Sequence, residues 1–459
     1  MSEEPEPLKP LRAPLPENSR GYGWDDRYEE IVNIFPHEPL EKYLRNGFHP
    51  VILGDRFYDG RYTVRHKLGF GGNATVWLAR DSRENQWVAL KIKQAKAFSD
   101  DIEQDPEIKA MKLLEHKYTT HGSTKSRCFS RLLNYFQHVG PNGTHTCLVT
   151  ELLGPSIEQM IRVFDAMIPW DDPDYQEVET FRPDTILRSS RQLLEAVETL
   201  RLWGIVHGDI SPSNVSFTCQ DAVDDEELIE VLGGEPTVAE YSASEPRAEC
   251  LPKHLVRAAT WCGWFDCPEE SIRLIDWGES FSSNNKVSLL SQPLNLRSPE
   301  TFFIGSFDHQ HDLWRAGCVI YQLFYRQTPF GISFDKQNHI NAMALVMGPL
   351  PLAWHDQWIK IVQERPGFDP EPRGEPRFQP LHKTFEQRRH FIVTLTEKDE
   401  DFEKPDFIED DYQGLSCLLS VMNGLMQHEP HKRITSGEAL ARIQWADQWV
   451  YNEPENEEE

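Results

Sequence analysis

The stretch Ile205–Asn214, with the sequence IVHGDISPSN, constrains the fold of this chain more than any other segment. An apolar pair leads into a polar loop in which Asp209 and Asn214 stand five positions apart. With this spacing one side chain can orient a hydroxyl group while the other holds a metal ion, as phosphoryl transfer requires. Taken alone, the pattern also fits a polar turn in which both side chains cap backbone groups. Its interpretation therefore depends on the segments around it.

A glycine-rich segment precedes this loop. Alternating residues predict a strand over 61–68 and a second strand ending at Ala79, with Gly69, Gly71 and Gly72 between them. Glycines in such a hairpin let backbone amides approach phosphate oxygens, because no Cβ stands in the way. Since a strand and not a helix follows the glycines, we predict a nucleotide lid rather than a dinucleotide-binding turn.

The next predicted strand, over 87–93, carries Lys91 among apolar neighbours. A lysine on a buried strand requires an anion as its partner. Either the phosphates of a nucleotide or Glu107, in a predicted helix over 105–116, can supply that anion. The alternative is a lysine on an edge strand that is exposed to water.

Three further features follow in chain order. An apolar strand that ends in a Gly-Pro break resembles a hinge, where backbone groups of Glu151 and Leu153 are placed to bond the edge of an adenine. Periodic apolar residues over 185–203 predict a helix that leads into the Asp209 loop. Asp276 follows another apolar strand and stands before a glycine, where it can bind magnesium while the chain turns away.

Composition limits the classes of partner. There are 47 Lys and Arg residues against 74 Asp and Glu residues, and the net charge of −27 argues against nonspecific binding to nucleic acid or to anionic membranes. The charge favours a basic protein partner, although solvated tails explain much of it equally well. Eight cysteines without a Cys-x-x-Cys pair predict reduced thiols. We expect no secretory signal. We also expect no membrane span, because Arg315 and Arg326 interrupt the best apolar run, 313–330.

In this order the motifs resemble those of the eukaryotic protein kinases, over roughly residues 48–450. Within the kinases the chain is most similar to the SR-protein kinase branch, in a fungal-looking form. The resemblance implies an α+β, bilobal fold with a mainly β N-lobe and a mainly helical C-lobe. The segments that carry it are His49–Val51, Gly54–Asp55, Val76–Ala79, Glu107–Lys109, Arg297–Glu300 and His339–Pro351.

We expect a flexible N-terminal arm at 1–45, an N-lobe at 46–153, a C-lobe at 154–450 and an acidic tail at 451–459. The arm is rich in proline and charge, with one amphipathic piece around 28–35. The C-lobe contains an insertion at about 219–270, which we predict to be a surface excursion because its apolar content is thin.

The resemblance implies a role for each site residue. Asp209 would orient the acceptor hydroxyl, Asn214 and Asp276 would hold magnesium, and Lys91 paired with Glu107 would hold the α- and β-phosphates of ATP. Residues 207–214 are called the catalytic loop below. The residues expected to bind the nucleotide are Leu68, Gly69, Gly71, Gly72, Val76, Ala89, Lys91, Glu151 and Leu153.

Three structural contacts are also implied by the resemblance. They are a stack of His207, Trp277 and Met111, support of the catalytic loop by Asp312, and a buried ion pair between Glu300 and Arg433.

The chain departs from the family pattern at four positions. Gly208 replaces an arginine that grips a phosphate on the activation segment, here Glu279–Ser298, which predicts activity without phosphorylation there. Ser211 stands where the family has a lysine that neutralises the transferring phosphoryl group, and Pro293 stands where a threonine joins that lysine. A lost preorganised donor lowers the rate by about 10²–10³-fold. Ser216 places a polar side chain at the usually aliphatic floor of the adenine site.

Two functions therefore stay open. The presence of Lys91, Glu107, Asp209, Asn214 and Asp276 favours a serine/threonine protein kinase that transfers the γ-phosphate of ATP, with Mg²⁺, to serine in Arg/Ser-rich proteins. The departures favour a nucleotide-binding or scaffold pseudokinase with little or no transferase activity. We expect a basic protein substrate, no direct contact with nucleic acid or membrane, a monomer, and a cytoplasmic location with access to the nucleus.

Overall fold

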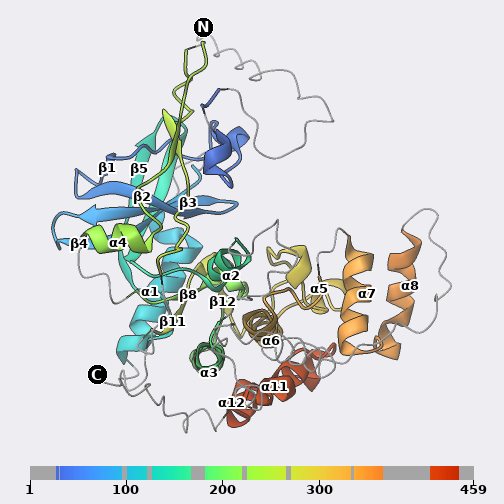
Figure 1. The fold of residues 1–459 in the computed structure, drawn as a ribbon. Coiled ribbons are helices and arrows are strands. Elements are labelled where there is room, and N and C mark those ends of the chain that lie inside the picture. The colour runs from blue at the N-terminus through green and yellow to red at the C-terminus, as the bar shows by residue number, and fades with distance from the viewer. Residues whose placement is uncertain are drawn as a thin grey trace, which may run out of the picture. The chain divides into compact units, whose positions relative to one another are not determined.

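A computed structural model describes residues 27–29, 31–95, 101–120, 127–166, 181–219, 225–244, 246–264, 270–331, 335–364 and 414–443. The predicted acidic tail lies outside these residues. The chain divides into two units (Figure 1). The first contains residues up to 99, 136–147 and 235–259, and the second contains 100–135, 148–234 and 260 onwards. Part of the predicted insertion belongs to the first unit, and the predicted domain bounds stay a prediction.

A six-stranded sheet has the strand order β1-β2-β3-β4-β6-β5, and β1–β4 belong wholly to the first unit (Figure 1). The strand pairs from β1 to β4 are antiparallel. Along β4 the residues Val88, Leu90 and Ile92 are buried and alternate with more exposed ones, as the sequence pattern predicts. The strands are β1 (Arg56–Phe57), β2 (Tyr62–Phe70), β3 (Ala74–Asp81), β4 (Gln86–Lys93), β5 (Leu132–Gly140) and β6 (Gly143–Glu151).

The segment from Tyr28 to Tyr43 is packed, which differs from the flexible arm expected there. It contains two short 3-10 helices, η2 (Ile31–Ile34) and η3 (Leu40–Lys42). Its apolar residues form a buried cluster with residues of the insertion, including Leu251 and Leu255. The Tyr28 hydroxyl donates a hydrogen bond to the Pro252 carbonyl at 2.9 Å. The arm folds because its amphipathic piece buries its apolar side against a distant part of the chain.

The insertion is more structured than a surface excursion. It contains α4 (Asp225–Val231) and the antiparallel strands β9 (Val238–Glu240) and β10 (His254–Val256). Residues 235–259 belong to the first unit, where the Ala259 amide donates to the Lys67 carbonyl of β2 at 2.8 Å. The few apolar residues of the insertion suffice because the N-terminal segment supplies the rest of their core.

A buried ion pair joins the N-terminal segment to β2. The Lys67 ammonium donates to the Glu38 carboxylate, which also accepts a hydrogen bond from the Tyr43 hydroxyl, and all three side chains are buried. Burial raises the pKa of Glu38, but the charge of Lys67 and the two hydrogen bonds outweigh it and lower that pKa below its usual value. Lys42 of the same segment donates to the Gly72 carbonyl in the glycine-rich turn. The segment therefore supports the strand and the turn that the sequence assigns to nucleotide binding.

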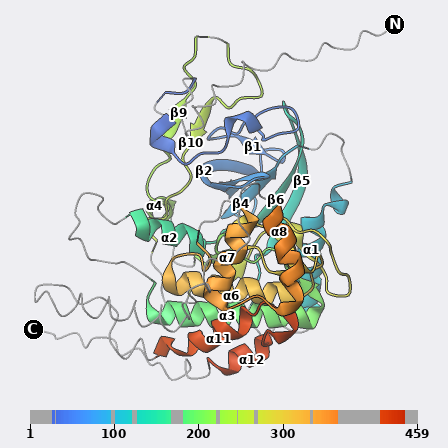
Figure 2. The ribbon, with the colours of Figure 1, turned by 90° about the vertical axis from the view of Figure 1, so that its right-hand side faces the viewer.

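The second unit is mainly helical, so the predicted combination of a β-rich part and a helical part is confirmed (Figure 2). Every residue of α6 from His311 to Tyr325 is buried, and α6 packs against α3 and α11. The predicted helix over 185–203 is α3, which ends at Gly204 in the left-handed conformation. The helices are α1 (Pro106–Thr120), α2 (Ile157–Ala166), α3 (Pro183–Trp203), α5 (Glu300–Phe303), α6 (Gln310–Tyr325), α7 (Lys336–Met347), α8 (His355–Gln363), α11 (Cys417–Leu425) and α12 (Ser436–Ala441).

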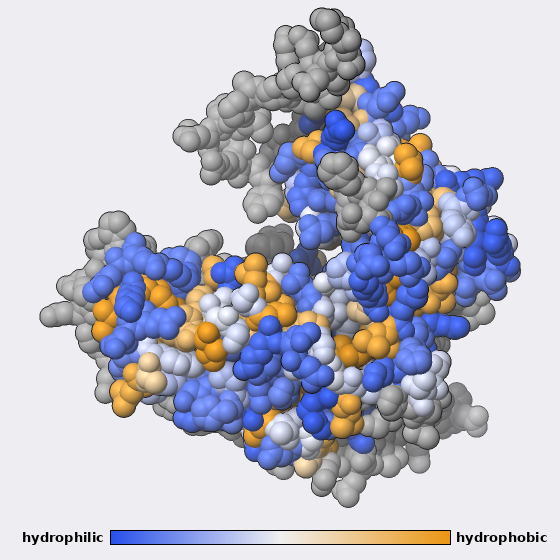
Figure 3. Space-filling view, turned by 180° about the vertical axis from the view of Figure 1, so that it is seen from behind, coloured by the Kyte–Doolittle hydropathy of each residue, from blue (hydrophilic) through white to orange (hydrophobic). Residues whose placement is uncertain are grey.

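A buried ion pair lies within this unit. Arg433 binds the Glu300 carboxylate through both terminal nitrogens, at 2.6 and 2.8 Å, and both side chains are buried, which confirms the predicted ion pair. Among the described helices, none has the length and apolar character needed to cross a membrane. The face drawn in Figure 3 is largely hydrophilic, with separate hydrophobic patches.

We predict that Lys67→Met lowers the free energy of unfolding by about 3 to 5 kcal/mol, because it leaves the Glu38 carboxylate buried without a cation. The double variant Lys67→Met/Glu38→Leu should recover most of this loss, since no charge then remains buried. Urea titration of both variants measures the difference. Lys112→Met, which breaks an exposed pair with Glu103, is the control and should change stability by less than about 1 kcal/mol. Equal losses in the single and double variants would contradict the prediction.

Candidate active site

Two small strand pairs bracket the catalytic loop. The loop follows α3 and lies between β7 (Ile205–Val206) and β8 (Val215–Phe217). Strand β7 pairs with β12 (Phe281–Ser282), and β8 pairs with β11 (Ile272–Leu274). Because Leu274 is opposite Val215 and the Ile275 amide donates to the Asn214 carbonyl at 3.0 Å, the segment that carries Asp276 lies beside Asn214. The pairing therefore brings the two predicted magnesium ligands to one place.

Asp312 of α6 holds the backbone of the catalytic loop. Its carboxylate accepts hydrogen bonds from the amides of His207, at 2.7 Å, and Gly208, at 3.0 Å. Burial raises the pKa of Asp312 to about 6, although the two amides oppose this shift. The predicted support of the loop by Asp312 is confirmed.

His207 fixes the loop from within. Its ring packs against Trp277, with ring centroids 4.4 Å apart and the ring planes at 50°, and both side chains are fully buried. Burial lowers the pKa of His207 to about 4, so the ring is neutral at pH 7. The Asp209 amide donates to Nδ1 at 3.2 Å, which leaves the hydrogen on Nε2 to donate to the Ile275 carbonyl at 3.2 Å. The predicted contact of His207 with Trp277 is confirmed, although the two rings are tilted rather than stacked. Met111 is buried in α1, which packs against the 3-10 helix Trp277–Glu279.

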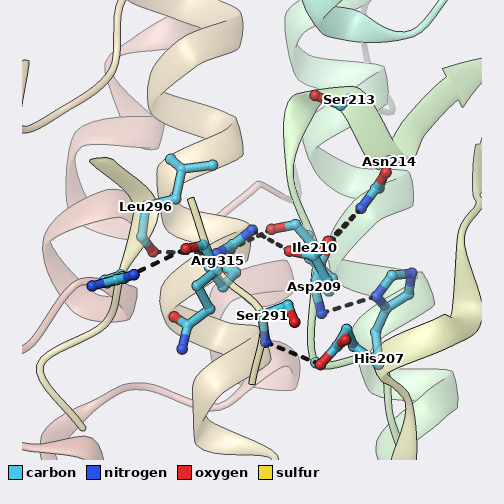
Figure 4. A network of polar contacts seen from close by, with 12 residues as sticks. His207, Asp209, Ile210, Ser213, Asn214, Ser291, Leu296 and Arg315 are labelled. Carbon is cyan, nitrogen blue, oxygen red and sulfur yellow. Dashed lines mark hydrogen bonds and ion pairs between the residues drawn. The ribbon is translucent and has the colours of Figure 1, made fainter. Parts of the chain in front are cut away.

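Both oxygens of the Asp209 carboxylate are held by side chains (Figure 4). Oδ1 accepts a hydrogen bond from Arg315 Nη2 at 2.9 Å, and Oδ2 accepts one from Asn214 Nδ2 at 2.9 Å. Burial raises the pKa of Asp209 to about 6; the charge of Arg315 lowers it, and that of Asp276 raises it. The Asp209 side chain keeps 22% of its surface exposed, so the carboxylate can meet a substrate.

Arg315 is a residue of the site that sequence reasoning did not assign. The sequence contained one signal for it, a charged residue inside the apolar run that became α6. A charge at a fully buried helical position requires an acceptor, but the pattern does not say which one.

The donor set of Asn214 and Asp276 fits magnesium. The Asn214 amide nitrogen donates to the Asp209 carbonyl and carboxylate, so the amide oxygen is left to face a cation. Asp276 has φ 64°, a left-handed conformation that few residues other than glycine adopt. One amide oxygen and one carboxylate suit Mg²⁺, which takes few protein ligands and completes its shell with phosphate and water oxygens.

The glycine-rich turn of the first unit leaves room for phosphate. A Cβ built on Gly69, Gly71 or Gly72 would find no other atom within 4 Å. The turn is closed by the Gly71 amide, which donates to the Ala74 carbonyl at 2.8 Å. These observations agree with the predicted nucleotide lid, while the bound nucleotide itself stays a prediction.

The other predicted nucleotide residues are divided between the units. Strand register places Val76 opposite Gly69 and Lys91, and Leu78 opposite Ala89, so the side chains of Val76, Ala89 and Lys91 share one face of the sheet. In the second unit, Glu151 ends β6, and the Leu153 amide donates to no backbone acceptor within the described residues. Glu107 is buried in the first turn of α1. Lys91 and Glu107 lie in different units, and their predicted pair stays a prediction.

Gly208 lies where the backbone leaves no room for a side chain. Its φ is 80°, and a Cβ at this position would lie 2.6 Å from the Glu279 carbonyl oxygen. A side chain would therefore collide with the backbone at the start of the activation segment. Glycine therefore fits position 208, whereas a larger residue would require this backbone to move.

Known proteins that are similar to this chain include serine/threonine protein kinases. No protein-family model matches the chain. A serine/threonine protein kinase of Aspergillus fumigatus is 29% identical over 322 residues, which cover 69% of this chain and 72% of that protein. The serine/threonine-protein kinase SRPK of Physarum polycephalum is 24% identical over 89% of this chain and 91% of its own length. Human SRSF protein kinase 3 is 30% identical over 52% of this chain and 38% of that protein.

The sheet, the helical unit, the Asp209 loop and these relatives together define a serine/threonine protein kinase. The chain is similar to kinases of the SR-protein kinase type, fungal ones among them. The kinase SKY1 of Saccharomyces cerevisiae is 32% identical over 42% of this chain and 25% of that protein. The kinase dsk1 of Schizosaccharomyces pombe is 34% identical over 42% of this chain and 33% of that protein. The predicted family and fold are confirmed.

We predict that Gly208→Ala lowers the free energy of unfolding by about 1 to 3 kcal/mol, because alanine is strained at this φ and meets the Glu279 carbonyl. Thermal or urea unfolding measures the change. Gly437→Ala is the matched control: it lies in α12, has no atom closer than 4.0 Å, and should leave stability unchanged or raise it by up to about 1 kcal/mol. A Gly208→Ala protein as stable as the control would contradict the prediction, because it would show that the backbone at Glu279 moves aside at no cost in stability.

Proposed function

We propose that this kinase is active and transfers the γ-phosphate of ATP to serine hydroxyls of Arg/Ser-rich proteins. The observation that carries the proposal is the Asp209 carboxylate, which is held at both oxygens and still partly exposed. A carboxylate fixed in this way is preorganised to bind a substrate hydroxyl, so that little reorganisation is needed at the moment of reaction.

In the proposed reaction, the serine Oγ forms a bond to the γ-phosphorus while the bond from that phosphorus to the β–γ bridging oxygen breaks. ADP leaves with the electron pair of the broken bond. The hydroxyl proton passes to the Asp209 carboxylate and from there to water. A pKa of about 6 keeps most of the Asp209 population ionised at neutral pH, as a proton acceptor requires.

Residues of both units would bind the other reactants. Asn214 and Asp276 would hold Mg²⁺, which supplies charge neutralisation of the phosphate oxygens. The glycine-rich turn would cover the phosphates, and Lys91 would pair with them. Glu151 and Leu153 would bond the adenine through their backbone groups.

Charge and sequence similarity both support Arg/Ser-rich proteins as the substrate class. The excess of 74 acidic over 47 basic residues favours a basic partner and speeds its encounter with the kinase. The similarity to SR-protein kinases points to arginine as the basic residue and serine as the acceptor. Arginine also forms two parallel hydrogen bonds with a carboxylate, which lysine does not.

One observation favours the pseudokinase alternative. Ser211 is buried and too short to place a cation on the transferring phosphoryl group, and Pro293 has no hydroxyl to join such a network. A protein that binds ATP without transferring phosphate would fit this loss.

We predict that the protein transfers labelled phosphate from Mg-ATP to an Arg-Ser repeat peptide, and that Asp209→Asn lowers kcat by about 10²–10⁴-fold because the proton acceptor is lost. Asp356→Asn removes an exposed carboxylate on α8 and serves as the control, with kcat within about twofold of wild type. No transfer by wild type, together with a rise in Tm on adding ATP, would instead establish the pseudokinase.

For the substrate class, we predict that kcat/KM falls by at least about tenfold when lysine replaces arginine in the repeat peptide, since bidentate pairing is lost. A peptide with glutamate in place of arginine should not be phosphorylated measurably. Raising the salt concentration should increase KM for the Arg-Ser peptide, because exposed charges are screened. Equal rates for all three peptides would reject the Arg/Ser class while leaving kinase activity intact.

A further inference from the structure

The Arg315 guanidinium is fully buried in the second unit, and all three of its nitrogens are hydrogen bonded. Nη2 donates to Asp209 Oδ1 at 2.9 Å, Nε donates to the Ile210 carbonyl, and Nη1 donates to the Leu296 carbonyl at 3.3 Å. None of the side chain is exposed. A buried charge is expensive unless it is paired and hydrogen bonded, and these three acceptors meet that requirement.

These acceptors come from two separate parts of the chain. Asp209 and Ile210 belong to the catalytic loop, whereas Leu296 ends the 3-10 helix Leu294–Leu296 close to the end of the activation segment. Arg315 itself belongs to α6, three positions after Asp312. Its side chain therefore connects the rigid helix, the proton acceptor and the activation segment (Figure 4).

Arg315 also completes the orientation of the Asp209 carboxylate. Asn214 binds Oδ2 alone, and a carboxylate held at one oxygen can still turn about its Cβ–Cγ bond. The second contact, at Oδ1, comes from Arg315. With both contacts present, the carboxylate plane is fixed relative to α6.

Position 211 in the same loop provides no cation that could orient the Asp209 carboxylate. Ser211 is buried, its backbone is extended, and its carbonyl accepts the Asn214 amide at 2.9 Å. At position 293, proline provides no side-chain donor or acceptor. Among the described residues, Arg315 is the only cation recorded in a salt bridge with Asp209.

We propose that Arg315 is the positioning residue of this kinase, which orients Asp209 and ties the catalytic loop to the activation segment in place of a cation at position 211. This proposal rests on the proposed kinase function for its catalytic consequence, but not for the tie itself. Because its side chain is fully buried, Arg315 acts through Asp209 and does not contact the transferring phosphoryl group. It therefore contributes to turnover and not to the binding of ATP.

The test compares Arg315→Met, Arg315→Lys and the double variant Arg315→Met/Ser211→Lys. Methionine fills the space of the arginine stem without a charge, so the protein should fold. We expect Arg315→Met to lower kcat for the Arg-Ser peptide by about 10²–10³-fold, with KM for ATP changed by less than about threefold. Arg315→Lys keeps the charge, so its kcat should be about tenfold higher than that of Arg315→Met. The double variant Arg315→Met/Ser211→Lys should show a similar rise in kcat, because it places a cation at position 211.

Arg433→Lys is the matched control, because Arg433 is also a buried arginine with a carboxylate partner in the same unit. It should lower Tm and leave kcat and KM within about twofold. The proposal is overturned if Arg315→Met keeps kcat within threefold of wild type. It is also overturned if neither lysine variant recovers turnover.

A second measurement does not depend on catalysis and tests the tie itself, which is the set of hydrogen bonds from Arg315 to the catalytic loop and to Leu296. In Arg315→Met, amide hydrogen exchange should be at least about tenfold faster in peptides covering 207–214 and 293–297, and unchanged in a peptide covering α12. Unchanged exchange in the loop and the activation segment would reject the tie. If the wild type transfers no phosphate, the proposed function fails, while faster exchange in both segments still supports the tie. If Arg315→Met does not fold, the same exchange comparison is made with Arg315→Lys, which loses two of the three hydrogen bonds.

Discussion

The hydrogen bonds from the catalytic loop to α6 are the contacts on which the rest of this site depends. Asp312 accepts the amides of His207 and Gly208, and Arg315 donates to Asp209, Ile210 and Leu296. Two charged residues on one buried helix thus determine where the loop backbone lies and how its carboxylate is turned. Because α6 is buried along almost its entire length, it provides a rigid base for both.

Burial determines the chemistry of this loop as much as its geometry. It raises the pKa of Asp209 and of Asp312 to about 6 and lowers the pKa of His207 to about 4. The charge of Arg315 opposes the shift at Asp209. The result is a neutral histidine that acts through packing and a carboxylate that stays mostly ionised at neutral pH. The loop therefore holds a mostly ionised carboxylate beside a histidine that is uncharged at neutral pH.

The local parts of the fold were predictable because their signals are local. The glycine-rich turn, the alternation along β4 and the helix α3 follow from periodicity and from residues with restricted conformations. The N-terminal segment and the insertion were not predictable in this way. Each has too few apolar residues to form a core, but together they bury Tyr28, Leu251 and Leu255 in one cluster. The apolar content of a single segment does not reveal a core that it forms together with a distant segment.

The sequence by itself determined the catalytic constellation, because Asp209, Asn214 and Asp276 stand in an order and spacing that phosphoryl transfer requires. It also showed that the usual lysine is absent at position 211. Only the tertiary structure decided which residue holds Asp209, and that Lys67 pairs with Glu38. The physical reason is the same in both cases. A buried charge must find its counter-charge nearby in space, and the partner lies 106 positions away for Arg315 and 29 for Lys67.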